Sequence, residues 1–179
     1  GSPSGVVLED VDKYDAIQQL VKTAQTEGQF LQLLTSARAY ENELMKEKSF
    51  DKAEEIAQLV YNACFKNVGK RFRADALRQK EFVAQTSKRW ASVREALTRI
   101  DANDSRPSPF ADVVAQWEIE VEDNWSTAIH YLTLSQDERI RDAAHKELVA
   151  DATDARSCLE VANKWWNVAS DAGALQRQF

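Results

Sequence analysis

The sequence predicts an all-α fold, a bundle of about eight helices paired as irregular hairpins, with one long central helix. Three observations favour this fold class. Apolar residues recur every three or four positions from Tyr14 onward, which is the spacing of one helix face. No run alternates apolar and polar residues for long, as a half-buried strand would. Only five glycines and three prolines interrupt 179 residues, so long helices are expected.

The composition argues against several classes of function. Lys and Arg number 23 against 29 Asp and Glu, which gives a formal net charge of −6. A protein of this charge repels phosphate backbones and anionic lipid, so nucleic acid is not the expected partner. No stretch approaches the roughly 18 apolar residues that a membrane span requires, and no span is predicted.

The first two helices are expected to form a hairpin. The first should cover residues 13–26, with Asp12 as its N-cap and Gly28 as its end. Its apolar stripe consists of Tyr14, Ile17, Leu20, Val21 and Ala24. The second helix should begin near Gln29 and stop before Ser49. Its stripe consists of Phe30, Leu33, Leu34, Ala37, Tyr40 and Leu44.

A third helix and a long fourth helix complete the first part of the chain. Ser49 is expected to cap a helix over residues 50–66, and Gly69 to mark its exit. The inner face of this helix consists of Ala53, Ile56, Ala57, Val60, Tyr61 and Cys64. Nothing interrupts the helical pattern over residues 70–100, which would span roughly 45 Å. Seven-residue spacing predicts that this helix contacts its neighbours through Val83, Trp90, Val93, Leu97 and Ile100.

Residues 101–108 form the clearest linker, because Asp, Asn, Ser and Pro gather there and disfavour helix. We therefore predict an N-terminal helical subdomain over residues 12–100, which includes the long helix. A C-terminal subdomain of helical hairpins should follow over residues 109–179. Residues 1–11 are expected to be a cloning remnant and a flexible leader.

The C-terminal subdomain is expected to open with a helix capped by Ser108, with Pro109 in its first turn. The apolar stripe of this helix consists of Phe110, Val113, Val114, Trp117 and Val121. A turn at residues 123–124 should lead into a short helix over residues 125–134. Ser135 and Glu138 are then predicted to form a capping box. The helix that follows should bury Ile140, Ala143, Ala144 and Leu148.

The last helix is expected over residues 154–172, with a wide apolar face formed by Val161, Ala162, Trp165, Trp166 and Ala169. Trp165 and Trp166 point about 100° apart, so both cannot lie at the centre of one narrow seam. The favoured interpretation is that each indole packs in a groove of its own. In the alternative, one indole lines a concave surface that recognises a peptide or another domain.

Two segments of the chain resemble each other, Lys-Ser-Phe-Asp-Lys-Ala at residues 48–53 and Asp-Asn-Trp-Ser-Thr-Ala at residues 123–128. In a helical hairpin, the aromatic residue would pack under the turn and the alanine would let two helices approach closely. The pattern resembles the inter-helix turn of tetratricopeptide repeats. The two copies lie 75 residues apart, and no period of about 34 residues is sustained between them.

Residues 122–169 are similar to a family of tetratricopeptide-like helical domains common in planctomycete bacteria. In that family an Asp-Trp turn starts a short helix, and a last helix carries a tryptophan pair. The matching positions are Trp125, Ile129, Leu132, Asp137, Ile140, Leu148, Trp165 and Trp166. The resemblance extends with weaker motifs over residues 49–170. The chain departs from the family at Ala128, His130 and Ser135, where glycine, proline and glycine are usual.

The resemblance implies a tetratricopeptide-like fold without catalytic residues or a cofactor. Such domains often accompany other domains in larger cell-surface or exported planctomycete proteins. We therefore expect a non-catalytic helical-repeat scaffold or protein–protein interaction module that binds an unidentified protein or peptide. The identity of the partner and the oligomeric state stay open.

A first rival hypothesis is a metal-binding or enzymatic bundle that uses His145, Asp142 and the acidic residues 118–123. The chain lacks the Glu-x-x-His pairs of di-iron bundles, so no metal site is predicted. Cys64 and Cys158 are expected to be buried free thiols, with a disulfide as the alternative. No catalytic residue, metal or cofactor is therefore expected.

A second rival hypothesis is a binder of an acidic partner or of nucleic acid through the basic residues 66–99. This segment carries ten basic and three acidic residues. It is also consistent with a solvated helix that attracts acidic neighbours. Nucleic acid is disfavoured because no aromatic residues are interleaved on the basic face. The candidate partner-binding residues are Trp165, Trp166, Arg71, Arg78, Lys88 and Arg89.

Overall fold

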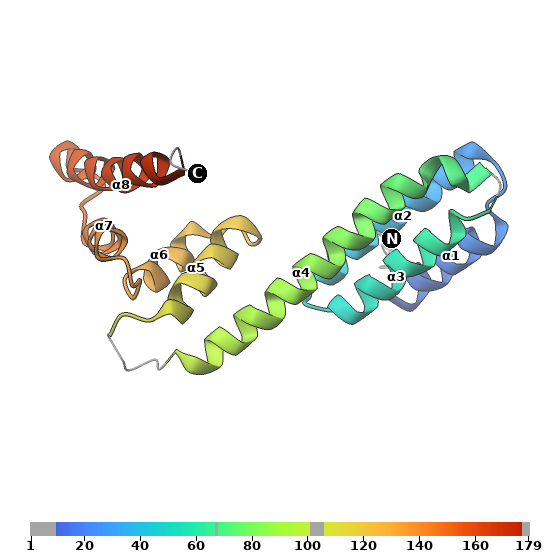
Figure 1. Cartoon of the computed structure of the whole chain (residues 1–179), viewed down its shortest axis with the longest axis horizontal. Helices are drawn as coiled ribbons and strands as arrows, with labels where there is room; N and C mark the ends of the chain where they lie inside the picture. The colour runs from blue at the N-terminus through green and yellow to red at the C-terminus, as the bar shows by residue number, and fades with distance from the viewer. Residues whose placement is uncertain (1–9, 67, 101–105, 177–179) are drawn as a thin grey trace, which may run out of the picture. The chain divides into compact units, whose positions relative to one another are not determined.

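In the computed structural model, which describes residues 10–66, 68–100 and 106–176, the chain forms eight α-helices, one 3-10 helix and no strand (Figure 1). The predicted all-α fold is confirmed. The elements are α1 (Asp10–Thr23), α2 (Glu27–Lys46), α3 (Phe50–Ala63), η1 (Val68–Phe72), α4 (Arg73–Arg99), α5 (Pro109–Glu120), α6 (Trp125–Leu132), α7 (Glu138–Leu148) and α8 (Ala155–Gln176).

The chain divides into two compact units, an N-terminal unit of residues 1–88 and a C-terminal unit of residues 89–179. The division falls within α4, which contributes its first part to one unit and its last turns to the other. The sequence places the joint in the linker 101–108, of which residues 101–105 lie outside the described part of the chain. The predicted leader over residues 1–11 also falls almost wholly outside it.

The core of the N-terminal unit forms where α1, α2 and α3 pack side by side and the first part of α4 joins them (Figure 1). The predicted apolar faces of α2 and α3 supply most of it, because their large side chains recur at helical spacing. Its buried members include Ile17, Phe30, Leu33, Ala37, Tyr40, Leu44, Ala53, Ile56, Ala57, Val60, Cys64, Ala76 and Val83.

The ends of α1 and α2 differ from the prediction. Helix α1 already begins at Asp10, so Asp12 lies within the helix rather than at its cap. Gly28 does not end α1 but lies in the first turn of α2. Thr26 is the N-cap of α2, since its hydroxyl accepts from the Gln29 N–H and the Gln29 side chain accepts from the Thr26 N–H. This reciprocal capping box fixes the helix start more strongly than a glycine does.

Ser49 and Gly69 also have roles that the sequence did not indicate. Ser49 occupies the N-cap position of α3, but its ψ of 55° is not extended, and its hydroxyl accepts no capping hydrogen bond. Gly69 is buried in η1, where a Cβ atom would lie 2.8 Å from the Phe30 ring and 2.9 Å from the Cys64 Cα. The backbone passes so close to α2 and α3 that only glycine fits. The expected helix over residues 70–100 therefore starts at Arg73.

In the C-terminal unit, α5 and α6 pack as a hairpin, and α7 and α8 follow. Ser108 caps α5 as predicted, with Pro109 in the first turn. Trp117 is fully buried and lies 5.3 Å from the Trp90 ring. The other buried hydrophobic side chains are Val93, Ala96, Ala111, Val114, Ala115, Ala128, Ile129, Leu132, Ala143 and Ala144.

Some residues that were predicted to be buried in this unit are exposed. Before α8, the exposed members of the predicted stripes are Leu97, Val113, Val121 and Leu148. The buried positions of α5 and α7 are instead held largely by alanines, whose small side chains let the neighbouring backbones approach closely. The larger residues beside them are left at the edge of the packed face.

Candidate functional site

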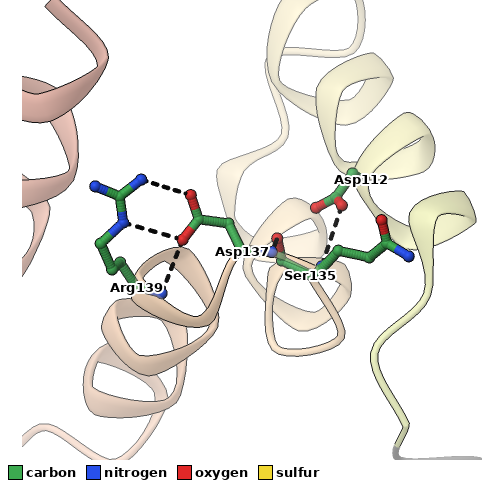
Figure 2. Close-up of polar contacts among 5 residues, drawn as sticks. Asp112, Ser135, Asp137 and Arg139 are labelled. Atoms are coloured by element: carbon green, nitrogen blue, oxygen red, sulfur yellow. Dashed lines mark hydrogen bonds and ion pairs between the residues drawn. The ribbon is translucent and has the colours of Figure 1, made fainter. Parts of the chain in front are cut away.

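A polar joint fixes α5, α6 and α7 against one another (Figure 2). The Gln136 N–H donates to the Asp112 carboxylate at 3.2 Å, and the Arg141 guanidinium donates to the Ser135 carbonyl at 2.7 Å. The Ser108 N–H donates to the Leu134 carbonyl at 2.8 Å. Because these bonds join three helices, they hold α7 in a fixed position against α5 and α6.

The same joint corrects the predicted cap of α7. Asp137, not Ser135, is the N-cap, and its carboxylate accepts from the Arg139 N–H at 2.9 Å. Ser135 is fully buried, and its hydroxyl accepts from the Asp137 N–H at 3.1 Å (Figure 2). Hydrogen bonds from the Arg139 side chain lower the pKa of Asp137. The carboxylate thus stays ionised at the positive end of α7, where it is favoured.

A tryptophan–glutamate–tryptophan cluster joins α6, α7 and α8. The Trp125 Nε1–H donates to one carboxylate oxygen of Glu147 at 2.6 Å, and the Trp165 Nε1–H donates to the other at 2.6 Å. The two indole rings meet edge to face, with centroids 5.4 Å apart. Charge-assisted bonds of this kind are roughly twice as strong as neutral ones, so Glu147 anchors α8 to the other two helices.

Ion pairs add to the anchoring of α8. Lys146 lies 2.6 Å from Glu160, and Lys164 lies 3.8 Å from Asp142. The hydrogen bond from Lys146 lowers the pKa of Glu160. The packed face of α8 therefore carries Trp165 together with the half-buried Val161 and Val168.

A second apolar face of α8 is uncovered among the described residues. Leu159 is 62% exposed, Trp166 is 73% exposed, and Ala162 and Ala169 are exposed beside them. Their spacing of three and four residues places all four along one side of the helix. We call these four residues the α8 stripe. The favoured prediction that both indoles are packed is therefore correct for Trp165 and wrong for Trp166.

The four basic candidate residues are exposed and mostly engaged with carboxylates. Arg71 lies 2.7 Å from Glu27, Arg78 pairs with Asp75, and Arg89 lies 2.6 Å from Glu120. Lys88 is also exposed. Arg71, Arg78 and Lys88 belong to the N-terminal unit, whereas Arg89, Trp165 and Trp166 belong to the C-terminal unit. Because the six candidates are divided between the two units, neither unit holds all of them in one site.

Aromatic residues do lie against basic ones, at a place that the sequence pattern missed. The Arg73 guanidinium lies 4.2 Å from the Phe65 ring centroid, and the Lys80 amine lies 5.0 Å from that of Tyr61. These rings come from α3 and the turn after it, not from the basic helix itself. A sequence pattern along one helix does not show a contact between two helices. The only sequence signal is the four-residue spacing of Tyr61 and Phe65.

One carboxylate is buried in the N-terminal core. Glu41 on α2 is 1% exposed and accepts a hydrogen bond from the Gln79 amide of α4 at 2.7 Å. It lines a cavity of about 10 Å³ together with apolar residues of α3. Burial raises the pKa of Glu41 to about 7, and the Gln79 hydrogen bond and the nearby Arg38 oppose this rise only in part. Burial therefore favours the protonated form of this carboxyl more than in an exposed glutamate.

Several of the groups that the metal or enzyme hypothesis required are engaged elsewhere. Asp142 faces Lys164, and among the acidic residues 118–123 Glu120 pairs with Arg89 and Glu122 accepts from the Trp117 indole. Within the described ranges, no group of three His, Cys, Asp or Glu side chains is placed to hold a metal ion. Nothing in these contacts assembles a nucleophile with a base.

The two cysteines differ in their environment. Cys64 is buried in the N-terminal core, and desolvation raises the pKa of its thiol. Cys158 is exposed at the start of α8, so the prediction that it is buried was wrong. Both are free thiols in the structure. A buried thiol with a raised pKa is poorly reactive, so Cys64 acts as a core side chain.

No family model, no curated protein and no solved structure matches the chain. Over residues 10–66, 68–100 and 106–176, no helix combines the length and apolarity needed to cross a bilayer.

Proposed function

We propose that the chain is a non-catalytic interaction module and that the α8 stripe docks against an apolar face of a protein partner. The exposure of Trp166 carries this proposal. An indole is among the largest apolar side chains, and leaving it in water forgoes roughly 1.5–3 kcal/mol of burial. Trp166 is 73% exposed although the adjacent Trp165 is held by Glu147. Tryptophan is also the residue type most enriched at the energetic centres of interfaces.

The contacts that hold α8 in place support the same function. Glu147 and the pairs Lys146–Glu160 and Lys164–Asp142 fix the helix from its other side. A surface that is already ordered loses less conformational entropy on binding than a flexible one. The α8 stripe is therefore suited to a partner that offers a matching apolar helix or groove.

The resemblance to tetratricopeptide-like planctomycete domains supports an interaction role as well. Members of that family have no catalytic residues attributed to them. They often accompany other domains in larger cell-surface or exported proteins. We propose the same setting for this chain.

Site-specific photo-crosslinking in cells that carry the natural gene tests the proposal. A photoreactive residue at Ala162 probes the α8 stripe, and the same residue at Asn167 probes the polar side of α8 about 140° away. Both positions are exposed, so they form a matched pair. We expect one defined cross-linked species from position 162 and none from position 167. Absence of a product at 162, or the same product at both positions, would contradict the proposal.

A further inference from the structure

A cluster of two cations and two aromatic rings lies on the N-terminal unit, at the end of α3 and the start of α4. The Tyr61 and Phe65 rings meet edge to face, with centroids 5.1 Å apart. Arg73 lies 4.2 Å from the Phe65 centroid and 6.0 Å from that of Tyr61, while Lys80 lies 5.0 Å from that of Tyr61. We call these four residues the cation–aromatic patch.

The charges of this patch are not neutralised by carboxylates of the described residues. Arg71 and Arg78, which flank Arg73 in sequence, pair with Glu27 and Asp75. Arg73 and Lys80 instead contact aromatic rings, which attract a cation but carry no net charge. The patch therefore keeps two positive charges.

Basic residues outnumber acidic ones around the patch, where Asp75 of α4 pairs with Arg78 and Glu81 follows Lys80 in sequence. On α3, Gln58 donates to Asn62 at 2.7 Å, so the turn next to Tyr61 carries two amides and no acid. Lys66 donates to the backbone carbonyl of Val21 at 3.1 Å, which leaves its charge in place as well. In a chain of net charge −6, this end of the N-terminal unit is a local positive region.

The aromatic rings also hold the two cations in place. A guanidinium stacked on a ring keeps its N–H donors directed outward at its edge, and an amine over a ring keeps donors for other acceptors. Arg73 and Lys80 are seven residues apart on α4, which separates them by about 10 Å along the helix. A peptide in the extended polyproline II conformation rises roughly 3.1 Å per residue with three residues per turn, so side chains three residues apart lie on one side and span about the same distance.

We propose that the cation–aromatic patch binds an extended acidic segment of a partner protein, with carboxylates three residues apart that reach Arg73 and Lys80. This site is separate from the α8 stripe and does not depend on it. A single strand of nucleic acid fits less well, because its bases require open aromatic faces and the cations lie over those of Tyr61 and Phe65.

Fluorescence anisotropy with the full chain and three labelled probes tests this inference. The probes are a nine-residue peptide with Asp at every third position, a peptide of the same composition with its three Asp residues contiguous, and a thymidine oligonucleotide of nine residues. We expect the spaced peptide to bind most tightly and its binding to weaken as salt is raised. Tighter binding of the oligonucleotide, or no binding of the spaced peptide, would overturn the proposal.

Two double variants with equal loss of charge separate the patch from general electrostatics. Arg73→Gln/Lys80→Gln should weaken binding of the spaced peptide about tenfold, since two exposed ion pairs are lost. Arg71→Gln/Arg78→Gln removes the same charge from residues that already have carboxylate partners, and should change binding less than about threefold. Equal losses in both variants would overturn the assignment to Arg73 and Lys80.

Charge-conserving variants distinguish a loss of charge at the patch from a defect in folding. Arg73→Lys and Lys80→Arg keep the positive charges over the rings and should bind the spaced peptide within about threefold of the unchanged chain. A tenfold loss in these variants, with unchanged circular dichroism, would contradict a site that recognises charge.

Discussion

The α2–α3 and α5–α6 hairpins share the same pattern in the turn and at the start of the second helix. Lys48 and Asp123 are the two described non-glycine residues with positive φ, at 62° and 51°. An aromatic residue then opens each helix, and Ala53 or Ala128 follows with no exposed surface. The small side chain allows the two helices of each hairpin to approach closely. The likeness of residues 48–53 and 123–128 therefore extends to the backbone.

The two hairpins differ in what surrounds the aromatic residue. Phe50 is 5% exposed, whereas Trp125 is 42% exposed and directs its indole N–H to Glu147. The turns differ too, since the Ser49 N–H reaches the Leu44 carbonyl, five residues back, and the Asn124 N–H reaches the Glu118 carbonyl, six residues back. The wider second turn accompanies an aromatic ring at the surface.

The same contrast extends to the whole units. Among the described residues, the N-terminal unit buries ten hydrophobic side chains larger than alanine, and the C-terminal unit buries five. Large exposed hydrophobic residues number three in the first and nine in the second. Contiguous apolar patches such as the α8 stripe mark interaction surfaces, whereas exposed apolar residues that are scattered singly are common on any protein. The N-terminal unit thus buries more bulky apolar side chains, whereas the C-terminal unit leaves more of them exposed.

The largest effect is expected from two leucines that represent the two units. Leu33 is fully buried, so Leu33→Ala leaves a cavity and should lower the free energy of unfolding by about 2–5 kcal/mol. Leu159 is 62% exposed, so Leu159→Ala should change it by less than about 0.5 kcal/mol. Urea titrations followed by circular dichroism measure both. Equal losses would remove the contrast between the units.

A fall in stability toward neutral pH is expected from the N-terminal core. Because burial raises the pKa of Glu41 from 4.5 to about 7, the folded chain holds a proton that the unfolded chain releases between these values. Stability should therefore fall by up to about 3 kcal/mol as pH rises from 4.5 through 7. Glu41→Gln should abolish this fall and stabilise the fold at pH 8.

The control for this effect is Glu43→Gln, which removes an exposed carboxylate paired with Lys13 at 2.5 Å. It should leave the fall in stability between pH 5 and pH 8 unchanged, as measured by urea titration at each pH. A Glu41→Gln chain that retains the full pH dependence would show that another group is responsible.

Two glycines give the next largest difference. Gly69→Ala places a methyl group against the Phe30 ring and the Cys64 backbone, and should destabilise the fold by about 1–3 kcal/mol. Gly28→Ala, where no atom lies within 4 Å, should stabilise α2 by about 0.5 kcal/mol. Thermal unfolding of both variants measures the pair. A neutral Gly69→Ala would mean that η1 can move away from α2.

A smaller loss is expected at the anchor of α8. Glu147→Ala removes the acceptor of both indoles, and should destabilise the C-terminal unit by about 1 kcal/mol because water partly replaces the lost bonds. Near-ultraviolet circular dichroism reports the Trp125–Trp165 pair directly. Glu138→Gln, an exposed change on the same helix, should leave that spectrum intact. An unchanged spectrum in Glu147→Ala would disprove the anchoring role.

Helical periodicity predicted the fold class and the core of the N-terminal unit. One side of α2 carries Phe30, Leu33, Tyr40 and Leu44. Large apolar side chains at this spacing are removed from water when that side of the helix packs against other helices. Helix ends were harder to predict. Thr26 and Gln29 cap α2 reciprocally, so α2 begins before Gly28 and the glycine does not break the helix.

The candidate surfaces could be predicted only in part. Periodicity shows that Trp165 and Trp166 face different directions, but it cannot show which of them meets another helix. That choice depends on Glu147, which approaches from α7 and selects Trp165. The aromatic partners of Arg73 and Lys80 were likewise missed because they belong to another helix. Contacts between elements that are distant in sequence therefore decide these surfaces.

The most direct test compares two effects of a single change, Trp166→Ala. Removal of an indole that is 73% exposed should leave the free energy of unfolding within about 0.5 kcal/mol of the unchanged chain. The same change should reduce the yield of the cross-link from position 162 in cells at least tenfold, since an interface tryptophan commonly contributes about 2 kcal/mol or more. An unchanged cross-link yield, or a large loss of stability, would contradict a partner-binding role for the α8 stripe.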